Sequence, residues 1–305
     1  MERKGQGENP AIVVAGASGQ LGQRIISVLL SRGVQPKALV RAGSKVPDGI
    51  SGARIVPVDY NNVQTLIEAC NGADCVISAL SGLQDVIIHA QASLLRAAVK
   101  AGVRRFIPSD FCIDYTQLPE GRNRNLDLRR TFRQQLDSAP IAATSIFNGM
   151  FTDLLLKEAP LIQKGMKRVL YWGNRDQLLD FTTMDDTAAY TAMAAMESHT
   201  PRFLRIAGDA LSSRGLQEAA SRATGQQYKL TRIGGLGLFK AMIRITKTLA
   251  PQPKEVFPPW QGMQYMHNMY TGLPKLQPLD NDRYPDMHWT TVEDVLRKLR
   301  DETSE

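Results

Sequence analysis

The stretch VVAGASGQLGQRI, residues 13–25, places Gly16, Gly19 and Gly22 three residues apart. An apolar run of strand length precedes these glycines, and residues with helical periodicity follow them. In this context the motif is typical of a turn that binds a dinucleotide, because glycine permits a tight turn and close approach of a pyrophosphate. The alternative is a glycine-rich turn that binds nothing. We expect phosphates at the helix N-terminus, on Gly16, Ser18, Gly19, Gln20, Leu21 and Gly22.

The end of the next expected strand, residues 37–41, indicates which dinucleotide binds. A site selective for NAD usually places an Asp or Glu roughly 20 residues after the glycine turn, at the ribose 2′-hydroxyl. This chain has Arg41 at that place, and Lys45 follows shortly after it. A guanidinium suits a 2′-phosphate and offers no acceptor to a hydroxyl. The sequence therefore predicts NADP(H), and a solvated arginine at a strand end is the alternative.

The ends of two later strands are expected to complete the dinucleotide site, because ligands of open α/β sheets bind beyond the carboxyl ends of the strands. Asp59 ends the third expected strand, where it could contact adenine or cap the helix that follows. The fourth expected strand, residues 74–80, ends in small and apolar residues that would lie along the cofactor. These residues are Ser78, Ala79 and Leu80.

Strand-type and helical segments alternate through the first half of the chain. Expected strands span residues 11–15, 37–41, 54–59 and 74–80, and a long helical pattern ends at Gly102. Short connections between such segments imply parallel strands that are joined by right-handed crossovers. We therefore predict an α/β protein with a Rossmann-like, doubly wound parallel sheet.

Composition argues against several other classes of protein. The 305 residues carry 37 Lys and Arg against 30 Asp and Glu, a net charge of +7 that mildly favours anionic partners. Arg129, Arg130 and Arg133 share a polar helix face that we expect to be solvated; a surface for a partner or an anionic substrate is the alternative, and no pattern indicates nucleic acid. Three cysteines and four histidines lack the spacing of a metal site. Without a secretory signal or membrane span, we expect a cytoplasmic protein with no membrane contact.

Five segments together resemble the NmrA-like and isoflavone-reductase-like proteins, which are atypical relatives of the short-chain dehydrogenases/reductases. The segments are VAGASGQLG, LVR, AAVKAGVRRFIPSDF, SIFNGMF and DFTTMDDTA, in this order within residues 11–208. Each segment alone is weak, but the combination is specific to the family.

The resemblance implies two domains. The NADP(H)-binding Rossmann domain would comprise residues 1–150, with residues 180–208 packed back on it. A smaller α+β domain for the substrate would comprise residues 151–179 and 209–305. The resemblance also places Asn148 beside the nicotinamide, where its amide could orient the carboxamide or a substrate carbonyl; an Asx turn is the alternative.

The resemblance implies two kinds of function. Reductases of the isoflavone, pinoresinol and phenylcoumaran benzylic ether type transfer hydride from NADPH to an aromatic substrate, whereas NmrA-type regulators bind dinucleotides and act through protein partners. The reductases carry a lysine as general acid/base on the helix after the FxPSxF loop. This chain has no lysine between Lys100 and Lys157, and no Tyr-x-x-x-Lys pair. The family's acid/base assignment therefore does not transfer to it.

Other residues could supply catalysis and hold the substrate. Tyr115 could donate a proton to a developing oxyanion, and Asp110 directly follows a strand end; a packed aromatic and a turn residue are the respective alternatives. A helical stripe near the C-terminus could form an aromatic pocket, although core packing is the usual role of such a stripe. We expect substrate contacts from Phe111, Phe151, Trp260, Met263 and His267.

These patterns together predict an NADPH-dependent reductase of a small aromatic or conjugated carbonyl substrate. A quinone fits well, since it needs little help from a protein acid. The alternative is a non-catalytic, NADP(H)-sensing regulator that binds a protein partner. The chain could form a homodimer, which nothing in the sequence determines.

Overall fold

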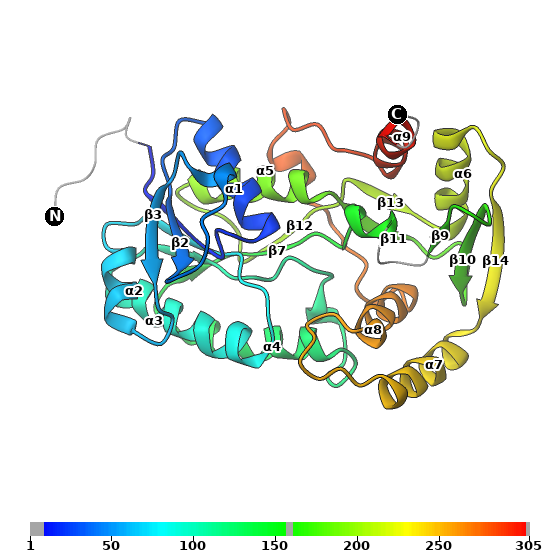
Figure 1. Ribbon diagram of the computed structural model, residues 1–305, viewed down its shortest axis with the longest axis horizontal. Coiled ribbons are helices and arrows are strands. Elements are labelled where there is room, and N and C mark those ends of the chain that lie inside the picture. The colour runs from blue at the N-terminus through cyan, green and yellow to red at the C-terminus, as the bar shows by residue number, and fades with distance from the viewer. Residues whose placement is uncertain (1–8, 157–160, 303–305) are drawn as a thin grey trace. The chain divides into compact units, whose positions relative to one another are not determined.

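The computed structural model describes residues 9–156 and 161–302 (Figure 1). The chain divides into two compact units. The first comprises residues 1–110, 128–146 and 188–204. The second comprises residues 111–127, 147–187 and 205–305.

A six-stranded sheet forms the centre of the first unit, with the order β3-β2-β1-β4-β5-β6. Every neighbouring pair is parallel. The strands are β1 (Ile12–Ala15), β2 (Lys37–Arg41), β3 (Arg54–Val58), β4 (Cys75–Ser78), β5 (Arg105–Ile107) and β6 (Ala142–Ala143). The strand order reverses at β1 and β4, as in a Rossmann fold. The predicted doubly wound α/β fold is confirmed.

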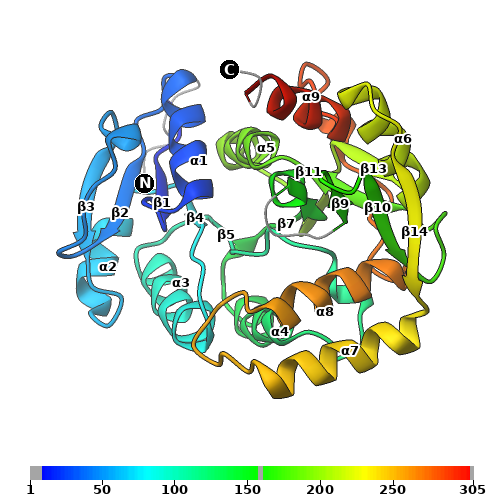
Figure 2. The same ribbon diagram turned by 45° about the vertical axis from the view of Figure 1, so that its right-hand side comes forward.

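Helices cover both faces of this sheet. Figure 2 shows α1 (Gln20–Ser31) on the opposite side of the sheet from α2 (Val63–Cys70) and α3 (Gln91–Lys100). One turn of π-helix, Asp85–Ala90, precedes α3. Since both faces are covered, all four residues of β1 are buried, and the strand is apolar throughout rather than alternating.

The core beneath α2 and α3 follows the two-residue period of the strands. Val13, Leu39 and Val76 point to this face from three adjacent strands and are at most 1% exposed. Leu66 of α2 and Leu95 of α3 pack against them. Burial of such side chains stabilises the unit by about 1.5–3 kcal/mol each, and it fixes the sheet edge where β1 and β4 end.

The second unit is built from short strands and longer helices. Its two three-stranded sheets have the orders β14-β10-β9 and β13-β11-β8, whereas β7 and β12, which pair with each other, lie mostly in the first unit. The strands are β7 (Ser145–Phe147), β8 (Met150–Phe151), β9 (Ile162–Gln163), β10 (Arg168–Trp172), β11 (Leu179–Thr182), β12 (Phe203–Arg205), β13 (Asp209–Leu211) and β14 (Lys229–Gly234). The remaining helices of the chain are α4 (Arg124–Asp137), α5 (Met184–Met196), α6 (Ser213–Thr224), α7 (Leu236–Leu249), α8 (Pro259–Tyr270) and α9 (Val292–Glu302).

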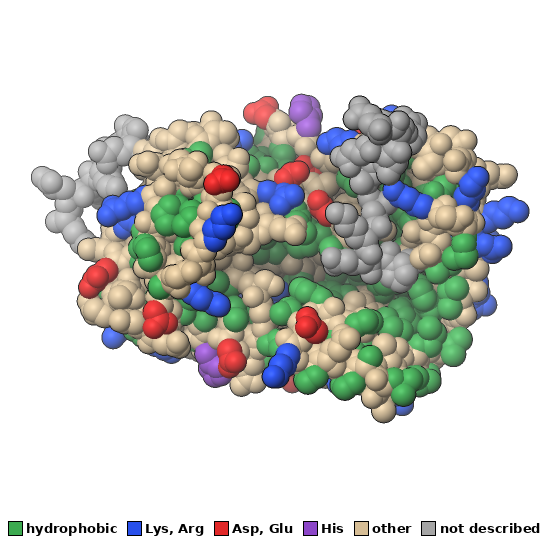
Figure 3. All heavy atoms as spheres, in the orientation of Figure 1, with side chains coloured by type: hydrophobic (Ala, Val, Ile, Leu, Met, Phe, Trp, Pro, Cys, Tyr) green, Lys and Arg blue, Asp and Glu red, His purple; other side chains and the backbone are tan. Residues whose placement is uncertain are grey.

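Helix α7 packs against α8 but leaves an apolar face in solvent. Leu238, Ile245 and Leu249 are 52%, 59% and 80% exposed. Figure 3 shows hydrophobic side chains gathered where this helix lies in Figure 1. Among the residues that the structure describes, no helix has the length and apolarity to cross a membrane. The same residues contain no cluster of three His, Cys, Asp or Glu side chains that could hold a metal.

Candidate functional site

The glycine turn between β1 and α1 leaves room for backbone only. Gly16 has φ +75°, and a Cβ there would lie 2.5 Å from the Ala79 carbonyl oxygen. At Gly22 a Cβ would lie 2.2 Å from the carbonyl oxygen of Gly16. The N–H of Gly19 donates to the same oxygen at 3.0 Å and closes the turn. These contacts explain why glycine is required at the first and third positions.

The N-terminus of α1 is open to an anion. Its N-cap is Gly19, and no side chain caps it in the described part of the chain. The first N–H groups of a helix have no acceptor within the helix, and they carry its positive end. Ser18, Gly19 and Gln20 are exposed, Leu21 is half-buried and Gly22 is buried. This cradle, which a side chain would fill, fits the diphosphate of a dinucleotide.

Arg41 ends β2 with its side chain exposed, and Lys45 follows it in an exposed loop. Tyr60, which was not expected at this site, lies close to both Arg41 and Gly16. Burial raises the pKa of Tyr60 to about 12, although backbone hydrogen bonding with Gly16 and the charge of Arg41 act in the opposite direction. Tyr60 therefore lies beside the glycine turn. A tyrosine two positions past a strand gives no periodic signal of such a contact.

Asp59 does not cap the helix that follows it. Its carboxylate accepts from the N–H of Asn61 at 2.9 Å in a local turn. The N-cap of α2 is Asn62, whose side chain accepts from the N–H groups of Gln64 and Thr65. The contact of Asp59 with adenine remains a prediction.

The end of β4 contacts the glycine turn. The N–H of Ala79 donates to the Ala15 carbonyl at 2.9 Å, so the two strand ends leave the sheet together. Ser78 is fully buried, and its hydroxyl has no hydrogen-bond partner among the described residues. The carbonyl of Leu80 accepts from the Ser109 hydroxyl at 2.5 Å. A buried hydroxyl without a partner at this edge is a candidate ligand contact.

Ser109 and Arg129 hold the loop after β5 in place. The N–H of Ser109 donates to the Gln91 side chain at 2.9 Å, and its carbonyl accepts from the Arg129 guanidinium at 2.9 Å. Arg129 is only 8% exposed, so the expectation of a solvated arginine at this position is wrong. Helical periodicity cannot reveal this role, because the acceptor is a backbone carbonyl 20 residues earlier.

The two residues proposed as catalytic are both buried. Asp110 is 1% exposed, and its carboxylate accepts from the Ser145 hydroxyl at 2.7 Å. Tyr115 is fully buried in the second unit and packs edge-on against Phe147, with ring centroids 5.4 Å apart. These contacts match the alternatives of an anchored turn residue and a packed aromatic. A direct chemical role for either residue remains a prediction from the sequence, which their burial and these contacts do not support.

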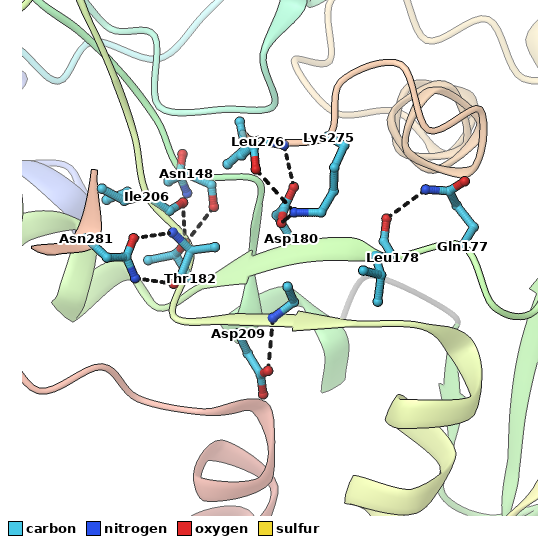
Figure 4. A network of polar contacts seen from close by, with 12 residues as sticks. Asn148, Gln177, Leu178, Asp180, Thr182, Ile206, Asp209, Lys275, Leu276 and Asn281 are labelled. Atoms are coloured by element: carbon cyan, nitrogen blue, oxygen red, sulfur yellow. Dashed lines mark hydrogen bonds and ion pairs between the residues drawn. The ribbon is translucent and has the colours of Figure 1, made fainter. Parts of the chain in front are cut away.

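Asn148 follows β7 in the second unit and is fully buried. Its carbonyl accepts from the Thr182 hydroxyl at 2.7 Å, as Figure 4 shows. Both polar atoms of its side chain lack a hydrogen-bond partner among the described residues, so the Asx turn does not form. Leaving a buried donor or acceptor unpaired costs about 1–3 kcal/mol, which points to a ligand as the partner.

The buried carboxylate of Asp180 pairs with the half-buried ammonium of Lys275 close to this segment (Figure 4). Gly149, with φ +69°, passes so close to β11 that a Cβ would lie 2.3 Å from the Asp180 carbonyl oxygen. The Asp180 carboxylate also accepts from the N–H of Leu276 at 2.8 Å. Burial raises the pKa of Asp180, and the hydrogen bonds and charge of its partners act against that rise. Lys275 was not expected at this site from the sequence.

The second unit contains all five residues that we expect around the substrate. Phe111 is 7% exposed and Trp260 is 2% exposed, while Phe151, Met263 and His267 are half-buried. Two cations lie over the ring of Trp260, Arg124 at 4.7 Å and Lys247 at 4.9 Å from its centroid. His267 lines a cavity of about 520 Å³. Substrate contact by these residues remains a prediction.

Comparison with known proteins relates nearly the whole chain to one family. The model of the NmrA-like family matches residues 8–294. Pinoresinol reductase 1 of Arabidopsis thaliana is 27% identical over 318 residues, which cover 95% of this chain and 97% of that protein. The isoflavone reductase homolog IRL of Zea mays is 24% identical and covers 96% of this chain and 99% of its own.

Solved structures share the fold. The structure of AtPrR2 with NADP⁺ and (+)pinoresinol has a TM-score of 0.78 at 24% identity, over 96% of this chain and 99% of its own. The NADPH-dependent quinone oxidoreductase QOR2 of Escherichia coli, complexed with NADPH, has a TM-score of 0.73 at 18% identity. That match covers 94% of this chain and 99% of the enzyme. The glycine turn, the sheet order and the length of the family match lead to one assignment: the chain belongs to the NmrA-like family.

Proposed function

We propose that the chain is an NADPH-dependent reductase that transfers hydride to a small aromatic or conjugated carbonyl substrate of the quinone type. The turn from Gly16 to Gly22 carries the proposal, because its backbone packing leaves an uncapped helix N-terminus exposed. The names of the relatives, pinoresinol and isoflavone reductases, support an oxidoreductase.

The cofactor would be held by the first unit. The diphosphate would lie on the N–H groups at Gly19 and Gln20, and Arg41 would bind the 2′-phosphate. Ser78 and Leu80 would lie along the remainder of the dinucleotide. When bound, reduced nicotinamide supplies the hydride, and the protein contributes binding and orientation.

The second unit would supply the substrate contacts. The buried amide of Asn148 would pair with a carboxamide or a substrate carbonyl, which would satisfy the two atoms that now lack partners. Because Tyr115 is fully buried and Asp110 is engaged by Ser145, we assign the proton that accompanies the hydride to water. Reduction of a quinone to a hydroquinone then consumes one hydride from the nicotinamide and one proton from water.

A four-way titration tests this function. NADPH, NADP⁺, NADH and NAD⁺ are titrated against the purified protein, and a panel of quinones and aromatic enones is then added while oxidation of NADPH is followed. Preference for NADPH together with turnover supports the reductase. Tyr115→Phe and Asp110→Asn are assayed in parallel, and a large loss of kcat in either would contradict the assignment of the proton to water.

The regulator remains the second candidate, because the chain lacks a lysine between Lys100 and Lys157. Tight binding of NADP(H) without turnover on any compound of the panel would favour it. The next measurement would then be capture of a protein partner at defined NADP⁺ and NADPH concentrations.

A further inference from the structure

The cavity beside His267 lies wholly within the second unit. Its volume of about 520 Å³ falls in the range of pockets that bind small organic molecules. Three segments line it, namely the loop before α4, helix α7 and helix α8. The charged and titratable side chains of the lining are Glu120, Arg122, Lys240, Arg244, Lys247 and His267.

Cations dominate this lining, with four against the one carboxylate of Glu120. Within the described residues, no carboxylate pairs with Arg122, Lys240 or Arg244. Lys247 lies over the ring of Trp260 at 4.9 Å rather than beside an acid. Cations gathered around a concave surface raise the local concentration of anions.

Helix α7 is amphipathic, and its buried side holds Phe239 and Ile243. A surface helix normally turns its charges to solvent. Lys240, Arg244 and Lys247, spaced four and three residues apart, are exposed and line the open cavity. The three cations therefore gather along the one side of α7 that borders the cavity.

The positive charges around the cavity affect the pKa of His267. Burial lowers the pKa of its imidazole, and the charges of Arg122 and Lys240 lower it further, while backbone hydrogen bonding with Leu236 acts to raise it. A neutral imidazole at this place can donate a hydrogen bond to an anion. A bound anion would offset the two cations and raise the pKa of His267.

We propose that this cavity binds an organic anion and that this anion is the substrate, an aromatic carbonyl compound that carries a sulfonate, carboxylate or phosphate group. The inference rests on the reductase activity proposed above and specifies its substrate class. Lys240 and Arg244 attract the anionic group, and His267 donates to it.

The test compares two quinones that differ in one anionic group, 1,4-naphthoquinone and 1,4-naphthoquinone-2-sulfonate. Steady-state oxidation of NADPH gives KM for both in the wild-type chain, in Arg244→Gln and in Lys240→Gln. Lys254→Gln is the matched control, since Lys254 is exposed, belongs to the same unit and is not part of the lining. In each cavity variant we expect the ratio of the sulfonate KM to the neutral KM to rise about 5- to 10-fold, and in the control to match the wild type.

A second readout needs no turnover. The pKa of His267 is followed by NMR in the holoprotein with NADP⁺, with and without the sulfonate, and His267→Gln assigns the resonance. A rise in pKa that is lost in Arg244→Gln supports the anion site. If both quinones turn over but neither the KM ratio nor the pKa responds, the anion site is overturned and the reductase stands. If the pKa rises but neither quinone is reduced, the reductase and the substrate role are overturned.

Discussion

A single methyl group added at Gly22 should impair nucleotide binding in a chain that still folds. A Cβ at this position would lie 2.2 Å from the Gly16 carbonyl oxygen and 2.9 Å from its carbon, both of which are backbone atoms. Ordinary contact begins at 3.4 Å, so the turn must open by the difference between 3.4 and 2.2 Å, about 1.2 Å. Displacing positioning groups by about 1 Å can cost on the order of 100-fold. We expect Gly22→Ala to weaken NADPH binding by about that factor.

The assay is calorimetric titration with NADPH, with thermal unfolding measured on the same samples. Overpacking alone destabilises by roughly 1–3 kcal/mol, so a control with a comparable loss of stability is needed. Gly102→Ala supplies it: Gly102 has φ +71° with open space around its Cβ, so the variant incurs about 1–2 kcal/mol of left-handed strain away from the turn. If folded Gly22→Ala protein binds NADPH as tightly as the Gly102→Ala protein, the reasoning is refuted.

Three further predictions concern charge. Arg41→Gln should weaken the binding of NADPH roughly 10- to 100-fold and leave the binding of NADH unchanged, since a hydrogen bond to a charged phosphate contributes about 1.5–3 kcal/mol. A titration in which both nucleotides lose affinity equally would contradict this prediction. Asp180→Asn removes the carboxylate that pairs with the half-buried Lys275 ammonium and should lower the free energy of unfolding by about 1–3 kcal/mol in urea denaturation. The pKa of His267 is lower in the folded chain than in the unfolded chain, so its contribution to stability is present above the unfolded pKa and is lost as the pH falls below it. Between about pH 7 and pH 5, the free energy of unfolding measured in urea should therefore fall less in His267→Gln than in the wild type. An equal fall in the two proteins would contradict this prediction.

The central sheet could be predicted because its strands are covered on both faces. A buried parallel strand is a short apolar run, and β2 spans the predicted residues 37–41. The fourth strand was predicted over residues 74–80 but ends at Ser78. Its last residues leave the sheet to meet the glycine turn, a contact between segments that apolar content alone cannot reveal.

The glycine turn was predictable because its contacts are local, apart from those with Ala79. Tyr60 was not, because its contact with Gly16 joins residues 44 positions apart and depends on how β3 aligns with β1. Arg129 was missed for the same reason. Its position on a polar helix face is visible in the sequence, whereas its acceptor, the Ser109 carbonyl, is visible only in the fold.

Lys275 lies far in the sequence from the residues expected to be catalytic. Asp110 and Tyr115 fall between Lys100 and Lys157, whereas Lys275 lies in the second unit beside Asp180, 95 positions away from it in the sequence. This lysine is engaged on two sides, since its ammonium donates to the Asp180 carboxylate and to the Leu276 carbonyl at 3.2 Å. A general acid must direct its proton toward the substrate, whereas Lys275 directs its donors to its own chain. The pair therefore stabilises the segment around β11 and Asn148, and its internal hydrogen bonding favours a substrate that takes its proton from water.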